Sequence, residues 1–320
     1  MNILFITSTR VGDAILSSGL LAQLISNYPE SKVTIACGPA AEPIFCGVPN
    51  LKRIIILDKM LFSLHWLVMW GSVVGTIWDV IVDLRNSPMT YLLLAKRRYR
   101  FKRKKNSGHR VEQLASVMGL NEQPPSPKVW IPDRARTAAI KLIPEGSLVL
   151  AIGPTANWSA KTWRPDHFID LLERLTRSDG LFPSARIALF GRDDERPLVI
   201  RIIESIPKER CIDLVGKIDL VEVGACIERS DFYIGNDSGL MHLAAAVGIP
   251  TLGLFGPSLD ELYAPWGHLS ASVRSDKTFE EIFPNNFDHR NTGSLMDGLT
   301  VDMVEDAARK LWKKTLGEEV

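Results

Sequence analysis

Short runs of apolar and β-branched residues alternate with amphipathic stretches along the whole chain of 320 residues. In the first half, the expected strands are residues 2–7, 32–36, 53–57, 79–83 and 99–101. Residues 13–26, which follow the first of these strands, have apolar residues at helical spacing. Continuous apolar strands separated by helices are typical of a parallel sheet covered on both faces. The alternation therefore predicts an α/β protein with doubly wound sheets.

The alternation breaks at the proline-rich segment 121–133 (NEQPPSPKVWIPD), which is expected to be a linker. A second series follows, with expected strands at 148–152, 186–190, 212–214, 232–234 and 251–254. A length of 320 residues suits two domains of ordinary size. The sequence predicts a first domain over 1–133, a second over 134–300, and a helix in 301–320 that packs back toward the first domain. The crevice between two such domains is the expected ligand site.

The charge is unevenly distributed. The formal net charge is +1, but residues 96–105 (KRRYRFKRKK) hold eight basic residues and no acidic one. The rest of the chain has 30 basic against 37 acidic residues, a net charge of −7. A basic patch on an acidic body indicates a local anionic partner rather than a general nucleic-acid surface.

Residues 61–78 (LFSLHWLVMWGSVVGTIW) contain no Asp, Glu, Lys or Arg. Their length is just inside the range of a membrane-spanning helix. However, the segment contains two glycines and a histidine and continues directly into an expected strand. It is therefore predicted to be a core helix or a helix on a membrane surface, where Trp66, Trp70 and Trp78 would suit the interface.

The first residues, MNILFITSTRVGD, lack the basic start of a signal peptide and are expected to form the first strand. The four cysteines have no C-x-x-C spacing, which favours free thiols in a reducing cytoplasm over a disulfide or zinc site. The sequence contains no D-x-D motif of the kind that holds a divalent cation, so no metal and no cofactor are implied.

The segment 232–257 (FYIGNDSGLMHLAAAVGIPTLGLFGP) is the most informative part of the chain. Its strand is expected to end at Ile234, and the residues from Gly235 to Gly239 form a tight turn into a helix. Exposed N–H groups and the positive end of the helix dipole at such a turn suit a diphosphate. His242 lies one turn into the helix. The alternative interpretation is an ordinary capped helix with a histidine facing the core.

This segment resembles the signature of the lipopolysaccharide heptosyltransferases, which form glycosyltransferase family 9. The family pattern is D-S/T-G-x-M-H-x-A-A-A-x-G-x-P followed by L-F-G-P-T. The matching residues are Asp237, Ser238, Gly239, Met241, His242, Ala244, Ala245, Ala246, Gly248 and Pro250. Ser258 replaces the usual Thr, and the likeness extends over nearly the whole chain. It implies the GT-B fold, in which two Rossmann-like doubly wound domains face a central cleft.

The resemblance assigns the nucleotide sugar to the second domain. Residues 153–175 (GPTANWSAKTWRPDHFIDLLERL) resemble the loop that holds the donor phosphates, with Thr155 and with Lys161 in the lysine position. Thr162 and Arg164 interrupt the family's spacing. A lysine there would offset the charge of the departing diphosphate. In FGRDDER, Glu195 is the expected nucleoside ligand; Asp193 or Asp194 are alternatives, and a structural role at a helix N-terminus is another. Asp237, Ser238, Gly239 and His242 complete the implied donor site.

The resemblance assigns the acceptor to the first domain. Thr9-Arg10-Val11-Gly12-Asp13 resembles the family's turn whose aspartate is the catalytic base, although Asp13 could instead cap the helix that starts there. His109-Arg110-Val111-Glu112 resembles another element of this domain. Lys102, Arg103, Lys104 and Lys105 are expected to contact an anionic acceptor or the membrane, each cation contributing about 1 kcal/mol near an anionic surface. Tyr99 and Phe101 alternate with basic residues as in some RNA-binding strands, but no RNP-like glycine pattern surrounds them, so nucleic acid is not an expected partner.

The resemblance implies an inverting, metal-independent transfer of heptose from ADP-heptose to a lipid-linked core oligosaccharide, at the cytoplasmic face of the inner membrane. One alternative is a related glycosyltransferase that uses another nucleotide sugar for surface polysaccharide. Another is an inactive protein that binds a nucleotide sugar or a polyanion. A nicotinamide-dependent dehydrogenase lacks support, because no G-x-G-x-x-G follows the first strand.

Overall fold

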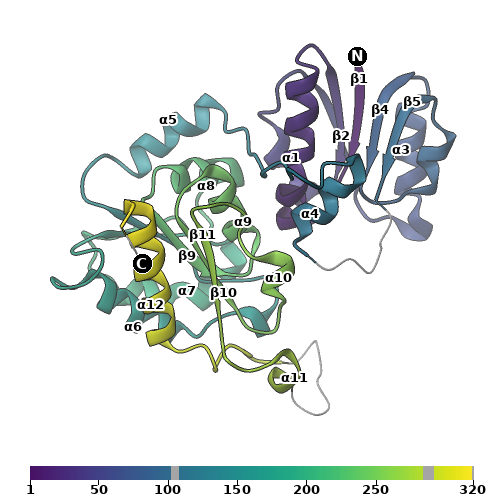
Figure 1. The fold of residues 1–320 in the computed structure, drawn as a ribbon. Coiled ribbons are helices and arrows are strands. Elements are labelled where there is room, and N and C mark those ends of the chain that lie inside the picture. Colours follow the sequence, from purple (N-terminus) through teal and green to yellow (C-terminus); the bar gives the residue numbers. More distant parts are fainter. Residues whose placement is uncertain (102–107, 284–291, 319–320) are drawn as a thin grey trace. The chain divides into compact units, whose positions relative to one another are not determined.

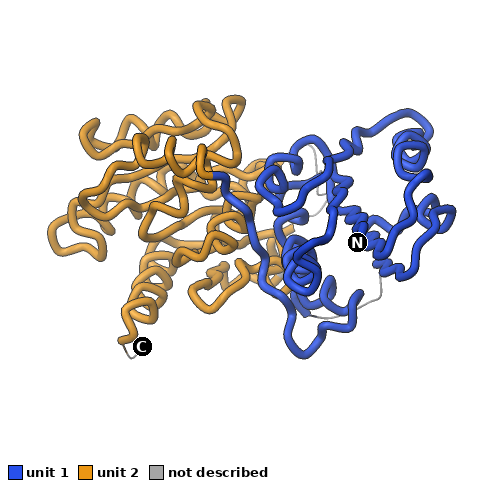
Figure 2. Tube along the Cα trace, turned by 90° about the horizontal axis from the view of Figure 1, so that it is seen from above, with its two compact units in different colours: residues 1–132 blue, residues 133–320 orange. Residues whose placement is uncertain are grey.

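The computed structural model describes residues 1–101, 108–283 and 292–318. The chain divides into two compact units, residues 1–132 and 133–320 (Figure 2). In the described residues each unit has one sheet, and its neighbouring strands pair in parallel (Figure 1). The prediction of an α/β protein with parallel, doubly wound sheets is confirmed.

The sheet of the first unit has the strand order β3-β2-β1-β4-β5. Its strands are β1 (Asn2–Ile6), β2 (Lys32–Cys37), β3 (Leu51–Ile56), β4 (Trp78–Asp83) and β5 (Ala95–Arg100). Its helices are α1 (Val11–Asn27), α2 (Glu42–Phe45), α3 (His65–Val73) and α4 (Arg110–Ala115), with short 3₁₀ turns η1 (Pro39–Ala41), η2 (Leu61–Ser63), η3 (Pro88–Leu92) and η4 (Ser116–Met118). Because side chains alternate along a strand, the complete burial of all four residues Ile3–Ile6 means that both faces of β1 are covered.

The sheet of the second unit has the strand order β11-β10-β9-β6-β7-β8. Its strands are β6 (Val149–Gly153), β7 (Arg186–Leu189), β8 (Cys211–Asp213), β9 (Phe232–Asn236), β10 (Thr251–Phe255) and β11 (Ser270–Arg274). Its helices are α5 (Asp133–Leu142), α6 (Pro165–Thr176), α7 (Arg196–Ser205), α8 (Leu220–Glu228), α9 (Gly239–Val247), α10 (Asp260–Tyr263), α11 (Phe279–Ile282) and α12 (Val301–Leu316), with turns η5 (Ser159–Lys161) and η6 (Asp193–Glu195).

Each sheet has a point where the chain reverses the direction in which it adds strands. In the first unit this point lies between β1 and β4, and in the second it lies between β6 and β9. The loops that follow two such strands run to opposite faces of the sheet and leave a crevice at the carboxyl edge, where α/β proteins bind ligands. The topology therefore identifies one candidate position in each unit.

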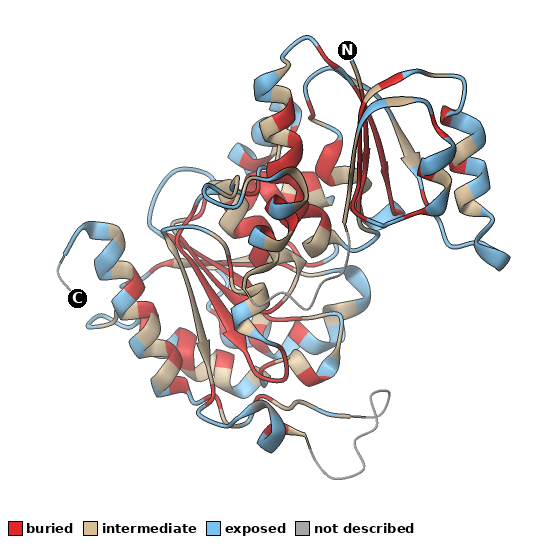
Figure 3. Cartoon of the chain, turned by 45° about the vertical axis from the view of Figure 1, so that its right-hand side comes forward, coloured by how far each residue is buried: buried red, intermediate tan, exposed pale blue. Residues whose placement is uncertain are grey.

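The core of each unit lies between its sheet and its helices, and Figure 3 shows that the buried residues concentrate on the strands. In the second unit, α12 contributes Val304, Ala308 and Leu311 to the main cluster and packs on α6, β10 and β11. The additional expectation, that residues 301–320 reach back toward the first unit, stays a prediction.

Several elements differ from the sequence-based expectation. The strand expected at 99–101 begins at Ala95, and β11 and α5 were not expected. All three are partly exposed, so their sequences lack the continuous apolar runs that identified the other elements. The expected linker 121–133 contains no helix or strand before Asp133, the first residue of α5. Residues 61–78 form the turn η2 and the nine-residue helix α3 before β4 begins at Trp78.

Candidate functional site

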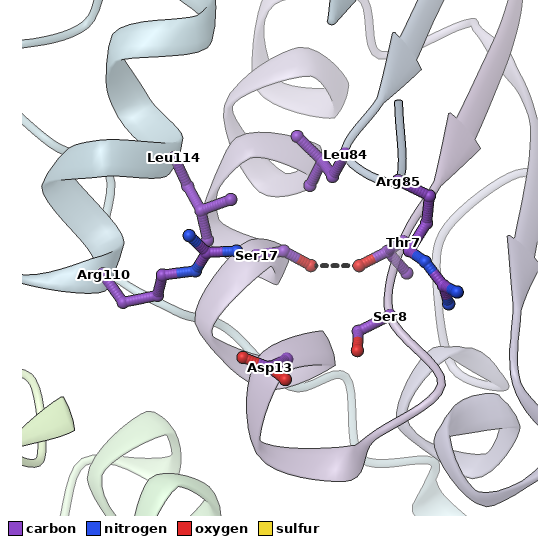
Figure 4. Close-up of a pocket in the computed structure, with 8 residues that line it drawn as sticks. All are labelled: Thr7, Ser8, Asp13, Ser17, Leu84, Arg85, Arg110 and Leu114. Carbon is purple, nitrogen blue, oxygen red and sulfur yellow. Dashed lines mark hydrogen bonds between the residues drawn. The ribbon is translucent and has the colours of Figure 1, made fainter. Parts of the chain in front are cut away.

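In the first unit, a pocket lies at the carboxyl edge of the sheet, where the strand order reverses (Figure 4). It is lined by residues that follow β1, residues that follow β4, and two residues of α4: Thr7, Ser8, Asp13, Ser17, Leu84, Arg85, Arg110 and Leu114. Two hydroxyl groups, Thr7 Oγ1 and Ser17 Oγ, are hydrogen-bonded to each other at 2.6 Å across it (Figure 4). The pocket is thus lined mainly by polar side chains.

Asp13 lies in the first turn of α1, inside the helix. The N-cap residue is Arg10, whose side chain forms no capping hydrogen bond, and its backbone N–H donates to Ser8 Oγ at 3.1 Å. Asp13 therefore does not cap α1, which was the alternative role considered for it. Its half-buried carboxylate lies in the pocket, where it could accept a proton from a bound hydroxyl.

Two guanidinium groups share this pocket with Asp13. Arg85 lies two residues after the end of β4, and Arg110 is the first residue of α4. The Arg110 guanidinium carbon lies 4.5 Å from the centre of the Phe101 ring, which holds the side chain by a cation–π contact. One carboxylate between two cations suits a polar ligand that carries negative charge near its reacting hydroxyl. Neither arginine was among the candidate site residues chosen from the sequence.

In the second unit, Lys161 and Asp237 meet at the carboxyl edge of the sheet. Lys161 ends the turn η5, which follows β6, and Asp237 follows β9. Lys161 Nζ lies 2.5 Å from Asp237 Oδ2, and both side chains are largely buried. Seventy-six residues separate them in the chain, and the reversal of strand order between β6 and β9 brings them together. The ammonium group is therefore held in place by a carboxylate at the edge of the sheet.

Asn236 fixes the two loops that carry this ion pair. Its side-chain amide donates to the Pro154 carbonyl oxygen at 2.8 Å, and its Oδ1 accepts from the Trp163 backbone N–H at 3.1 Å. The Trp163 indole is completely buried and donates to the Leu299 carbonyl oxygen at 2.8 Å. These bonds position the segment on both sides of Lys161. Asn236 was not selected from the sequence, although its fully buried amide sits within the NDSG turn.

Thr155 and Glu195 form a second pair, next to the first along the edge. Thr155 Oγ1 donates to Glu195 Oε2 at 2.9 Å, and the Arg192 backbone N–H donates to the same oxygen at 2.9 Å. Among the three acids of this turn, Glu195 alone contacts Thr155, whereas Asp194 pairs with the exposed Arg192 guanidinium. Glu195 therefore has both a structural role at the turn and a fixed position beside the β6 loop.

The turn after β9 leads into α9 as expected. Ser238 is the N-cap residue, Gly239 is the first helical residue, and His242 is 5% exposed. The Ser238 side chain makes no capping hydrogen bond. Burial raises the pKa of Tyr233, and the Ser238 side chain lowers it by a smaller amount.

The Tyr233 hydroxyl group occupies the space above two glycines that are paired across β6 and β9. A Cβ atom built on Gly153 would lie 1.9 Å from this hydroxyl oxygen, and one built on Gly235 would lie 2.4 Å from it. The Gly235 position is also blocked by the Gly153 carbonyl oxygen, at 2.7 Å. Both glycines are therefore required by close approach at the base of the candidate site.

We expect Gly153→Ala to lower the free energy of unfolding by at least about 1–3 kcal/mol, as overpacking of a rigid core does. Tyr233→Phe removes the nearest atom, so the double variant should recover part of the loss, measured as the midpoint of urea unfolding. The matched control is Gly235→Ala, where the backbone oxygen of Gly153 stays in the way. Equal rescue of both glycine variants by Tyr233→Phe would contradict this account.

Lys102, Arg103, Lys104 and Lys105, expected to contact the acceptor or membrane, lie outside the described residues. Among the described residues, no group of three His, Cys, Asp or Glu side chains is arranged to hold a metal ion. Likewise, no described helix is both long enough and apolar enough to cross a membrane. The structure thus brings the other expected side chains to two places: Asp13 in the first unit, and the remaining seven in the second.

Comparison with known proteins gives a consistent result. A sequence model of glycosyltransferase family 9 (heptosyltransferase) matches residues 83–283. Lipooligosaccharide heptosyltransferase 2 of Haemophilus influenzae is 24% identical over 311 residues, which cover 86% of this chain and 88% of that protein.

Solved structures share the fold. The structure of E. coli ADP-heptose lipopolysaccharide heptosyltransferase II is similar with a TM-score of 0.75 and 19% identity, covering 98% of this chain and 99% of that one. E. coli heptosyltransferase WaaC with ADP-2-deoxy-2-fluoro heptose is similar with a TM-score of 0.69 and 16% identity, covering 97% and 99%. Because the family model spans more than half of the sequence, the chain belongs to glycosyltransferase family 9 and is a glycosyltransferase with the GT-B fold.

Proposed function

We propose that this glycosyltransferase moves a heptose from ADP-heptose to a lipid-linked core oligosaccharide of lipopolysaccharide, with inversion at the anomeric carbon and without a metal ion. The names of its relatives support the donor and acceptor, since they include lipooligosaccharide and lipopolysaccharide heptosyltransferases. The observation that carries the proposal is the convergence of Lys161, Asp237, Thr155 and Glu195 at one edge of the second sheet.

In this proposal the second unit binds the donor. Lys161 and the N-terminus of α9, with Ser238 and Gly239, lie where a diphosphate would be stabilised by positive charge and by backbone N–H groups. Glu195 would accept hydrogen bonds from the ribose hydroxyls, held in place by Thr155. His242, in the first turn of α9, would contact the phosphates or the sugar. As the glycosidic bond breaks, Lys161 would offset the charge that grows on the leaving diphosphate.

The first unit binds the acceptor, and Asp13 is the general base. Its carboxylate takes the proton from the acceptor hydroxyl as the oxygen attacks the anomeric carbon opposite the departing diphosphate. A new carbon–oxygen bond forms as the bond to the diphosphate breaks, so one displacement inverts the configuration. Arg85 and Arg110, in the same pocket, supply positive charge for an acceptor that carries anionic groups.

A lipid-linked acceptor places the enzyme at the cytoplasmic face of the inner membrane. Lys102, Arg103, Lys104 and Lys105 follow the basic strand β5 and would add attraction to anionic acceptor groups or to anionic lipid. Two other functions remain alternatives: transfer from a different nucleotide sugar, and nucleotide-sugar or polyanion binding without catalysis.

The first test is thermal unfolding of the purified protein with ADP, UDP, GDP, CMP or NAD, without added metal. We expect a selective rise of the melting temperature with ADP, because a ligand present at 100 times its Kd stabilises the folded state by about 2.7 kcal/mol. Glu195→Gln should reduce this rise, while Asp194→Asn, which changes a neighbouring exposed acid, should leave it unchanged.

A selective rise with UDP or GDP would show that the donor is a sugar linked to that nucleotide and not ADP-heptose. With no response to any nucleotide, donor binding by this unit would be wrong. Transfer of heptose by the purified protein then separates catalysis from binding alone.

A further inference from the structure

Helix α3 of the first unit is apolar on both of its long faces. On the inner face, Met69 and Val73 are completely buried against the sheet. On the outer face, Leu67 and Val68 are 52% and 61% exposed, and the N-cap residue Leu64 is 43% exposed. A helix with apolar residues all round is normally buried on all sides or in contact with lipid. In the described chain, nothing covers the outer face of α3.

The exposed apolar side chains continue beyond the helix. Eleven of the 19 large apolar side chains exposed in the described chain lie between residues 60 and 94. We call them the α3 patch: Met60, Leu61, Phe62, Leu64, Leu67, Val68, Val74, Ile77, Tyr91, Leu92 and Leu94. The turn η3 belongs with α3 because the Trp70 indole donates to the Leu92 carbonyl oxygen at 3.4 Å. Scattered apolar side chains are normal on protein surfaces, whereas a concentration of this kind marks an interaction site.

The tip of the α3 patch is formed by residues that no core contact requires. Leu61 is 81% exposed and Phe62 is 95% exposed. Phe62 and Ser63 both have positive φ angles, 50° and 59°, a conformation that side chains larger than Asn rarely adopt. A phenylalanine held in this conformation and directed into solvent contributes little to folding. Its exposed ring is available for contact with a partner outside the chain.

Positive charge surrounds the α3 patch. The Arg85 guanidinium carbon lies 5.7 Å from the centre of the Trp66 ring, and that of Arg100 lies 3.8 Å from the centre of the Tyr91 ring. Arg53 hydrogen-bonds to the Ser72 carbonyl oxygen, and Arg98 to that of Leu93 at 2.7 Å.

Acidic residues are absent from the same stretches of sequence. Residues 59–78 and 84–101 contain no Asp or Glu. Of the two acids between these stretches, Asp79 is paired with Lys96, and Asp83 is completely buried beside Arg100. Apart from the exposed Asp58, two residues before Met60, the charge at the edge of the apolar surface is positive and therefore complementary to an anionic partner.

We propose that the α3 patch docks on the surface of a lipid bilayer that contains anionic headgroups. Apolar side chains at η2 and α3 would enter the acyl boundary, the partly exposed Trp66 would lie at the headgroups, and Arg53 and Arg98 would meet the phosphates. A second copy of the chain fits less well. A two-fold contact places the same surface on both sides, so these arginines would face each other. The inference rests on the proposed location at a membrane and names the surface responsible.

The test is flotation with vesicles of phosphatidylcholine alone and of phosphatidylcholine mixed with phosphatidylglycerol. The patch variant carries Leu61→Gln, Phe62→Asn and Leu67→Gln; Asn tolerates the positive φ at position 62, so the fold should be retained. We expect the wild type to float with the anionic vesicles, and the patch variant to bind them at least about tenfold more weakly, since each apolar side chain removed from lipid loses favourable burial.

The matched control carries Ile140→Gln and Leu198→Gln, on α5 and α7 of the second unit, each 53% exposed like Leu67. It should float like the wild type. Equal binding by the patch variant and the wild type, or no vesicle binding by the wild type, would overturn the inference. So would a dimer in light scattering that the patch variant alone converts to a monomer. The ADP-induced thermal shift and transfer to a lipid-free acceptor test the proposed function separately, and both should be unchanged in the patch variant.

Discussion

Replacing Asp13 with Asn is expected to reduce turnover by about 10²–10⁴-fold, the usual contribution of a general base. The amide has nearly the same shape as the carboxylate but cannot take the proton of the acceptor hydroxyl. Asp13 contributes no capping hydrogen bond, so the substitution leaves the hydrogen bonds at the start of α1 in place. The measurement is heptose transfer at saturating donor, together with the ADP-induced thermal shift, which should not change.

A first-turn acid also interacts with the helix dipole, and this effect needs its own control. Its loss is expected to cost about 0.3–1 kcal/mol of stability. Glu42→Gln removes a first-turn acid from the four-residue helix α2 of the same unit, outside the pocket. That variant should lose no more stability than Asp13→Asn and keep its turnover. Near-wild-type turnover of a folded Asp13→Asn protein would show that Asp13 is not the base.

The second large effect is expected from Lys161→Met. We expect kcat to fall by about 10²–10³-fold, because the charge on the leaving diphosphate would no longer be offset by a preorganised cation. The affinity for ADP should fall as well, measured by titration calorimetry. Asp237 would be left largely buried without its cation, which costs about 1–3 kcal/mol of stability.

The stability loss must be separated from the loss of turnover. Lys217→Met is the control, since Lys217 also pairs with a largely buried carboxylate of this unit, that of Asp213, at 2.7 Å, although Arg196 pairs with the same carboxylate. It should lose some stability and keep turnover and ADP affinity. If Lys161→Met kept both of these while losing stability alone, the lysine would be a structural partner of Asp237 and not a donor ligand.

The fold could be predicted from the sequence wherever a strand is buried on both faces. The strands β1, β2 and β7 differ from expectation by one residue at one end, and β6 begins and ends one residue later than expected. Prediction was poorer at the edges of the sheets. The residues of β11 are all half-buried, and β5 is mainly basic, so neither has the apolar pattern of a central strand.

The sequence predicted the residues of the candidate site that lie within local motifs, but not the contacts between distant motifs. The motifs located Asp13, Lys161 and Asp237 at the carboxyl ends of strands. They could not show that Lys161 would meet Asp237, because that contact depends on which strands are neighbours. Asn236 and Tyr233 were missed for the same reason, because their side chains act on residues about 80 positions away.

The crowding of Tyr233 against Gly153 and Gly235 restricts the order in which this part of the protein could change during evolution. A side chain at position 153 could be accommodated only after the tyrosine hydroxyl had been lost, and not before. At position 235 no change of the tyrosine would suffice, because a backbone oxygen occupies the space. A lineage that gains a side chain at position 153 before it loses the Tyr233 hydroxyl group would pass through a poorly folded intermediate. Divergence in donor choice is therefore expected in the loops around the site, while the strands beneath them remain as they are.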